Sequence, residues 1–212
     1  MERIPVKNNE EEIVSRAAAF LKQGKVLAAP TDTVYGLIAN AKNEQAIERV
    51  FTIKGRGLEK ALPVFISSFV MLDEVAFVSD LRVKEFLSRV WPGKVTCVLP
   101  SRGWMPFGVR EGGLTIGVRM PDYRLILKIM EKFGGPVTGT SANLSGRNSL
   151  SSAEEVAAEF RRVPFGPDYL LDVGDLPESR SSTVVDCTIW PPKMLREGAV
   201  SEEDINSRMS YT

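Results

Sequence analysis

The chain has 212 residues, of which 43% are hydrophobic and 25% are charged, as is typical of a soluble globular protein with one sizeable core. Its 27 Lys and Arg residues balance 27 Asp and Glu residues, and this zero net charge weakens the case for a nucleic-acid-binding protein. The sequence contains no histidine, which excludes a Ser-His-Asp triad, a histidine general base and histidine metal ligands.

The first half of the chain alternates amphipathic helices with short apolar strands. The period of the hydrophobic residues predicts a helix from about residue 10 that Gly24 ends, and the following KVLAAP predicts a strand. Residues 43–54 repeat the helical period, with Asn43 as the expected N-cap. LPVFIS then predicts another strand, and residues 80–91 predict a helix that ends at WPG.

The second half continues the same alternation. KVTCVLP and LTIGVRMP predict strands, and the Gly-rich SRGWMPFGVREGG between them predicts a loop. DYRLILKIMEKFGG, SAEEVAAEFRR and EEDINSRM predict helices, PVTGTSANLSG begins as a strand and becomes a loop, and YLLDVG and STVVDCTIW predict strands. This alternation predicts an α/β fold with a twisted mixed sheet flanked by helices, in a single domain over residues 1–212.

The cysteines and the N-terminal segment indicate an ordinary reduced protein. Cys97 and Cys187 lie in predicted buried strands without a CxxC spacing, so we interpret them as buried reduced thiols rather than a disulfide or a zinc site. MERIPVKNNEEE has no apolar signal segment, and no run approaches the length of a membrane span. We therefore expect a cytoplasmic protein that does not contact a membrane.

Four polar stretches follow or flank the predicted strands: PTDTVYG, KGRGLEK, TSANLSGRNS, and the pair SSTVVD and LREG. Ligands of open α/β sheets bind at strand ends, and hydroxyls, amides and cations donate well to phosphate or carboxylate. Lys54 and Arg56 would point the same way if their segment were extended. Taken singly, each stretch also has a structural interpretation: Asp32 as a turn residue, Lys54 and Arg56 as a solvated helix end. Tyr35 is expected at a rim or against a polar partner.

The order of these motifs resembles that of the YrdC family, the threonylcarbamoyl-adenylate synthases. The resemblance rests on PTDTVYGL, KGR with a following lysine, IGVRMP, TSANLSG, STVVD and LREG, and it covers about residues 10–198. It implies an α/β fold around a deep concave cavity. It also implies a nucleotidyltransferase that makes threonylcarbamoyl-AMP and pyrophosphate from L-threonine, bicarbonate and ATP. The product would serve the t6A modification at adenosine 37 of tRNAs reading ANN codons, through a downstream threonylcarbamoyl transferase complex.

Position by position, the resemblance implies that Thr33, Arg119 and Ser182 contact threonine. The residues that it implies for ATP are Arg56, Lys60, Thr115, Ser141, Asn143, Ser149 and Arg196. Lys54 and Arg56 would neutralise phosphate charge, and no side chain is assigned as a general acid or base. ATP is expected as a substrate accompanied by Mg²⁺, with no metal ligand from protein side chains.

Two departures and two rival functions accompany this resemblance. Some family members have a histidine on the threonine side after the basic loop, and the corresponding residue here is Phe65. Two-domain members have an additional C-terminal domain, which we do not expect here. One rival is a double-stranded RNA or tRNA-binding module without catalysis, against which the zero net charge argues. The other is a carbamoyl-transfer relative of hydrogenase-maturation domains, which act within much longer chains.

Overall fold

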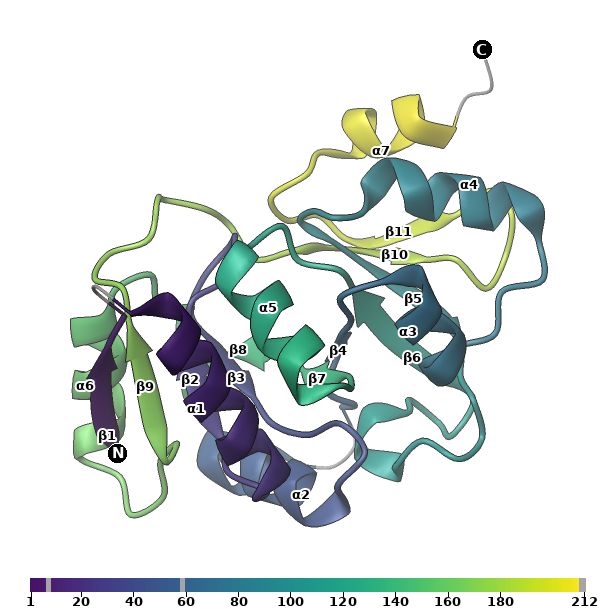
Figure 1. Cartoon of the computed structure of the whole chain (residues 1–212). Coiled ribbons are helices and arrows are strands. Elements are labelled where there is room, and N and C mark those ends of the chain that lie inside the picture. The colour runs from purple at the N-terminus through teal and green to yellow at the C-terminus, as the bar shows by residue number, and fades with distance from the viewer. Residues whose placement is uncertain (7–8, 58–59, 210–212) are drawn as a thin grey trace.

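Two mixed β-sheets flanked by helices make up the computed structural model, which describes residues 1–6, 9–57 and 60–209 (Figure 1). In spatial order, the first sheet consists of β1 (Glu2–Pro5), β9 (Tyr169–Asp172), β2 (Leu27–Ala29), β3 (Gly36–Ile38) and β8 (Thr140–Ser141). The second consists of β11 (Lys193–Arg196), β10 (Thr183–Asp186), β5 (Val95–Pro100), β6 (Thr115–Arg119), β4 (Val64–Phe65) and β7 (Val137–Thr138). The predicted mixed α/β class is confirmed, with its strands divided between two sheets.

The helices lie outside these sheets. They are α1 (Glu10–Lys22), α2 (Glu44–Lys54), α3 (Phe69–Val75), α4 (Leu81–Val90), α5 (Arg124–Phe133), α6 (Ala153–Arg161) and α7 (Glu202–Met209), with a 3-10 turn η1 (Phe107–Val109). Helix α1 packs against α5, and α4 lies beside α7 next to the second sheet (Figure 1). Asn43 caps α2 as predicted, because its side chain accepts a hydrogen bond from the Ala46 amide at 3.0 Å.

The C-terminal end of α2 corrects one expectation about the basic loop. Lys54 is the last residue of the helix, and Gly55 follows with φ 58°, the left-handed conformation that glycine adopts most readily. The segment is therefore not extended, so the period of two in an extended chain does not place Lys54 and Arg56 on one side. The helix predicted over residues 43–54 is confirmed as far as Lys54.

Between β7 and β8 the chain passes from one sheet to the other across one residue. Strand β7 belongs to the second sheet and β8 to the first, and only Gly139 separates them. Its amide donates to the carbonyl of Pro63 at 2.7 Å, which ties this junction to the residue before β4. The two sheets therefore meet beside Gly139, and the site described below lies where they meet.

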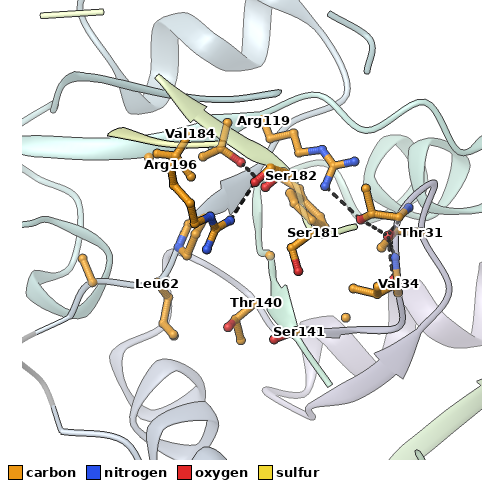
Figure 2. Close-up of a pocket in the computed structure, with 18 of the residues that line it drawn as sticks. Thr31, Val34, Leu62, Arg119, Thr140, Ser141, Ser181, Ser182, Val184 and Arg196 are labelled. Atoms are coloured by element: carbon orange, nitrogen blue, oxygen red, sulfur yellow. Dashed lines mark hydrogen bonds between the residues drawn. The ribbon is translucent and has the colours of Figure 1, made fainter. Parts of the chain in front are cut away.

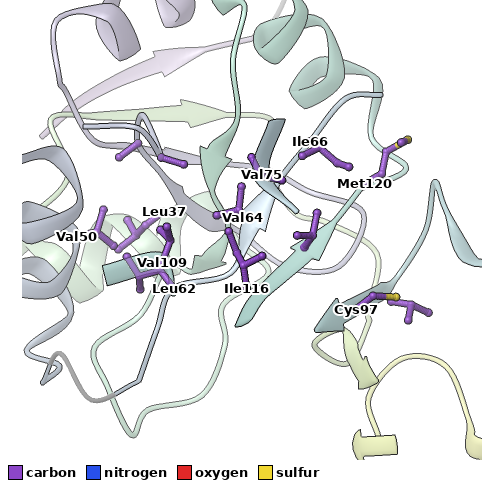
Figure 3. Packing of buried hydrophobic residues seen from close by; sticks show 14 of the residues in the cluster. Leu37, Val50, Leu62, Val64, Ile66, Val75, Cys97, Val109, Ile116 and Met120 are labelled. Atoms are coloured by element: carbon purple, nitrogen blue, oxygen red, sulfur yellow. The ribbon is translucent and has the colours of Figure 1, made fainter. Parts of the chain in front are cut away.

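The core fills the space around β4 and β6, where Leu62, Val64, Ile116 and Met120 gather with residues of α2 and α3 (Figure 3). Cys97 and Cys187 are buried free thiols, as predicted. They lie on the neighbouring parallel strands β5 and β10 or just beyond, and burial raises the pKa of Cys97 well above its usual value. In the described residues no helix combines the length and the apolar character needed to cross a membrane.

Candidate active site

A cavity of about 310 Å³ lies between the two sheets and gathers polar residues from distant parts of the chain (Figure 2). Eight of the residues singled out by the resemblance line it: Thr33, Lys54, Arg56, Arg119, Ser141, Asn143, Ser182 and Arg196. In Figure 2 the Arg119 guanidinium points toward Thr31 and Val34, whereas Arg196 lies on the side of Leu62. We call the two ends of the cavity the Arg119 end, which also holds Thr33 and Phe65, and the Arg196 end, which also holds Lys54 and Arg56.

The PTDTVYG segment forms a tight turn held by its own hydroxyls. Thr31 Oγ1 donates to the Val34 carbonyl at 2.7 Å and accepts from the Thr33 and Val34 amides. It also lies 3.1 Å from Thr33 Oγ1. Gly36 follows on β3, where a Cβ atom would come within 3.3 Å of the Thr140 carbonyl oxygen. The two threonines therefore shape the turn, and Thr33 is left facing the cavity.

Arg119 anchors the other wall of this end. Its side chain is 3% exposed, and it donates to Asp32 Oδ1 at 2.5 Å, to Thr33 Oγ1 at 3.2 Å and to the Gly93 carbonyl at 2.9 Å. Burial lowers the pKa of Arg119, and the Asp32 carboxylate opposes that effect. These bonds use three of the five guanidinium N–H groups and leave one N–H on each terminal nitrogen outside them.

Asp32 holds this arrangement rather than facing a ligand, in agreement with its assignment as a loop-holding residue. Its second carboxylate oxygen accepts from the Asp122 amide at 3.2 Å, and Asp32 is not among the described residues that line the cavity. Arg119 is a buried cation and not a surface charge, since the residue is 2% exposed.

Lys54 forms hydrogen bonds with the loop that contains Ser141 and Asn143. Its ammonium group donates to the Ser141 carbonyl at 2.6 Å, the Asn143 carbonyl at 2.9 Å and Asn143 Oδ1 at 3.3 Å. Burial lowers the pKa of Lys54 to about 8, and the nearby Arg56 charge contributes to that shift. Lys54 therefore fixes the TSAN loop, and it also lines the cavity.

Arg56 and Arg196 are held through backbone carbonyls. Arg56 donates to Ala61 at 3.4 Å, and Arg196 donates to Ser182 at 2.7 Å (Figure 2). The Ser182 hydroxyl in turn lies 2.9 Å from Thr96 Oγ1. Burial lowers the pKa of Arg196. Together with Lys54, these two guanidinium groups place three cationic side chains at the Arg196 end of the cavity.

The remaining three predicted residues lie outside the described lining of the cavity. Ser149 pairs with the cavity-lining Ser181 at 3.0 Å between hydroxyls, and Lys60 is exposed. Thr115 begins β6, where the period of two puts it on the same face as the cavity-lining Gly117 and Arg119. Their contact with ATP stays a prediction.

Tyr35 lies in the core and not at a rim. It is fully buried, and its hydroxyl donates to the Gly174 carbonyl at 2.9 Å and accepts from the Val173 amide at 3.2 Å. Burial raises the pKa of Tyr35 to about 12. The expected polar partner is therefore present, and it is the backbone after β9.

Sequence reasoning missed several residues that line the cavity, among them Thr96, Glu111, Ser145 and Ser181. Ser181 could have been found, because it directly precedes Ser182 in SSTVVD. Thr96 lies inside an apolar strand, and Glu111 lies in a Gly-rich loop, so no local pattern marks either. Glu111 supplies the only carboxylate among the described lining residues.

Comparison with known proteins decides the family. The family model Sua5/YciO/YrdC, described as "Telomere recombination", matches residues 19–198. The chain belongs to the Sua5/YciO/YrdC family. It is 39% identical over 197 residues to a threonylcarbamoyl-AMP synthase of Pyrococcus abyssi, and 35% identical over 195 residues to one of Bacillus subtilis. Each alignment covers 92% of this chain.

The structure agrees with this family membership. The crystal structure of Pyrococcus abyssi Sua5 complexed with L-threonine superposes with a TM-score of 0.89 at 36% identity, covering 98% of this chain and 60% of that one. The chain spans only 57% and 56% of the lengths of these two synthases.

Proposed function

We propose that this chain is a threonylcarbamoyl-AMP synthase, a nucleotidyltransferase that joins L-threonine, bicarbonate and ATP and releases pyrophosphate. The observation that carries the proposal is the division of one cavity into two ends of different charge. A buried Arg119–Asp32 pair with Thr33 lies at one end, and Lys54, Arg56 and Arg196 lie at the other. The names of the relatives, and the threonine-bound Pyrococcus abyssi structure, support this assignment.

The chemistry needs little from protein acids or bases. The neutral amine of threonine and bicarbonate form a carbamate and water. A carbamate oxygen then attacks the α-phosphorus of ATP, so that an O–P bond forms while the bond to the β-phosphate oxygen breaks and pyrophosphate leaves. Because the attacking oxygen is already anionic, this step needs no side-chain base, which agrees with a chain without histidine. What the step requires is positioning and charge neutralisation.

The Arg119 end is suited to the amino acid. The Arg119–Asp32 pair has no net charge, so it recognises a carboxylate by directed hydrogen bonds and not by net attraction. The two N–H groups outside the existing bonds would meet the threonine carboxylate, a planar match that a lysine cannot reproduce. Thr33 Oγ1, which faces the cavity beside Arg119, would contact the same ligand.

The Arg196 end is suited to the nucleotide. An anionic carbamate approaching an anionic phosphate is repelled, and the field of Lys54, Arg56 and Arg196 would offset that repulsion. Lys54 also fixes the loop of Ser141 and Asn143. Mg²⁺ would enter with the phosphates of ATP, whose oxygens it prefers as ligands.

The test is pyrophosphate release by the purified chain with ATP, Mg²⁺, bicarbonate and L-threonine. We expect release that requires both threonine and bicarbonate, with threonylcarbamoyl-AMP identified by mass. An RNA-binding module would release no pyrophosphate, and a carbamoyl-transfer relative would release it from ATP when given carbamoyl phosphate, without needing threonine. Either result would overturn the proposal. A role of the product in t6A formation, through a downstream transferase complex, is part of the same proposal.

A further inference from the structure

The ring of Phe65 fills the space beside Gly139. A methyl group at position 139 would overlap the Cε1 and Cδ1 atoms of the ring and come within 2.7 Å of Cζ. Real Cβ contacts are never so short, so the ring is seated where it is because residue 139 has no side chain. Both residues line the cavity. The junction between the two sheets and the aromatic wall are therefore one structural unit.

This unit lies next to the proposed carboxylate-binding guanidinium. Phe65 is the register partner of Arg119 in the parallel pair of β4 and β6, so both side chains stand on the same face. The Arg119 guanidinium carbon lies 5.6 Å from the centroid of the Phe65 ring, within the range of a cation–π contact. An amino acid whose carboxylate met Arg119 would therefore lie beside the aromatic ring.

The hydroxyl groups at this end of the cavity are already paired with protein partners. Thr33 Oγ1 contacts Arg119 and Thr31 Oγ1, and Thr31 Oγ1 donates to the Val34 carbonyl. Ser182 Oγ is paired with Thr96 Oγ1. The ring itself offers neither a hydrogen-bond donor nor a strong acceptor. The side chain of the amino acid would thus meet the apolar face of Phe65 beside hydroxyl groups that already have partners in the protein.

We propose that Phe65 and Gly139 determine the amino-acid specificity of this site, so that it selects a β-branched aliphatic shape rather than a hydroxyl group. Valine, the β-branched isostere of threonine, would then be a substrate beside threonine, and the unbranched L-2-aminobutyrate would be a poorer one. This inference rests on the proposed function and adds to it the class of amino acid accepted.

The expected selectivity follows from how poorly an apolar wall distinguishes isosteric groups. A hydrophobic pocket discriminates a methyl group from a hydroxyl by only about 100-fold, whereas a site built to bond the hydroxyl discriminates by roughly 10⁴- to 10⁵-fold. The ratio of kcat/KM for threonine over valine should therefore be below about 100 in the unmodified chain.

The experiment measures pyrophosphate release with threonine, valine and L-2-aminobutyrate, each with ATP, Mg²⁺ and bicarbonate. The variant Phe65→His replaces the ring with one that can bond a hydroxyl, and we expect the threonine-to-valine ratio to rise at least about tenfold. The matched control is Phe165→His, since Phe165 is 58% exposed and outside the described lining of the cavity, and it should leave the ratio unchanged.

A second pair of variants tests the coupling of the two residues. Gly139→Ala should lower the melting temperature and kcat/KM for threonine, because the methyl group overlaps the ring. Combining Gly139→Ala with Phe65→Leu should recover part of both losses, since the shorter side chain vacates that volume. Additive losses in the double variant would show that the two residues do not form one unit and would overturn the coupling.

The threonine-to-valine ratio of kcat/KM in the unmodified chain tests the inference even if a variant fails to fold. Release with threonine and a ratio below about 100 supports the inference, and a ratio above about 10⁴ overturns it while the proposed function stands. A folded Phe65→His protein with an unchanged ratio also overturns it. If no amino acid gives pyrophosphate, the proposed function itself has failed, which is a different result.

Discussion

The two ends of the cavity are held in place in different ways. At the Arg119 end, side chains hold one another: Asp32, Thr33 and Arg119 form a buried network in which the ion pair is 3% and 8% exposed. At the Arg196 end, Arg56 donates to the carbonyl of Ala61 and Arg196 to the carbonyl of Ser182, so these contacts of both guanidinium groups run to the backbone. The first arrangement suits a small ligand that must be oriented precisely, and the second suits a highly charged ligand that chiefly needs an electrostatic field.

The largest effect is expected from breaking the buried ion pair. Asp32→Ala leaves the Arg119 charge buried without its carboxylate, which typically costs about 3–5 kcal/mol of unfolding free energy, or roughly 6–20 °C in melting temperature. The matched control is Glu74→Ala, which breaks an exposed pair with Lys42 and should cost no more than about 1 kcal/mol. Equal melting temperatures for the two variants would mean that the buried Arg119–Asp32 pair contributes no more to stability than an exposed ion pair.

A substitution at the Arg196 end should lower the activity of the protein without lowering its stability. Arg56→Ala removes a charge-assisted contact with phosphate worth about 2–3 kcal/mol, or roughly 30- to 150-fold in kcat/KM for ATP. The melting temperature should stay the same or rise slightly, because Lys54 loses a neighbouring cation. Arg161→Ala, at an exposed arginine outside the described lining, serves as the control. Lost activity with a collapsed melting temperature would mark Arg56 as structural.

A pH dependence distinguishes the ends further, because burial and Arg56 lower the pKa of Lys54 to about 8. As pH rises through that value, the site loses a positive charge, and the affinity for ATP measured by calorimetric titration should fall. Stability should change in the opposite direction. Between about pH 8 and the ordinary lysine pKa of 10.5, the folded chain binds fewer protons than the unfolded chain, so this group adds stability as pH rises.

Replacing Lys54 provides the control for this profile. In Lys54→Arg the cation persists at high pH, and the loss of ATP affinity near pH 8 should disappear. An ATP affinity of the unmodified chain that stays constant from pH 7 to pH 9.5 would contradict the buried, charged state assigned to Lys54.

The smallest effect concerns the methyl group of threonine. Serine lacks it, and one methyl group contributes about 1 kcal/mol, so kcat/KM should favour threonine by roughly tenfold. The comparison uses pyrophosphate release with each amino acid under the same conditions. Equal values would remove apolar contact from the account of the Arg119 end.

Part of the fold could be predicted from sequence, because some elements carry a complete local pattern. Helix α2 has its N-cap Asn43, its hydrophobic period and its final glycine, all within 13 residues of sequence. Strand β3 has three residues inside a polar motif, and α3 has seven residues without a full amphipathic repeat, so neither was predicted. Their formation depends on pairing and packing with segments far along the chain.

For the site, too, the sequence predicts individual residues but not the long-range contacts between them. Motifs indicated most of its residues through a family resemblance, but not how those residues are connected. Nothing near Lys54 in the sequence shows that its ammonium group binds carbonyls 87 and 89 residues away. Likewise, the proximity of Phe65 to Gly139 follows from the junction of the two sheets, which no local pattern reveals.

The most direct test of the central claim, that one cavity binds threonine at the Arg119 end and ATP at the Arg196 end, is a pair of Michaelis constants in two variants. Arg119→Lys loses the planar contact with the carboxylate, so the KM for threonine should rise well above any change in the KM for ATP. Arg56→Ala should show the reverse. If both variants changed the two constants equally, or if Arg119→Lys left the KM for threonine unchanged, the assignment of the two ends would be wrong.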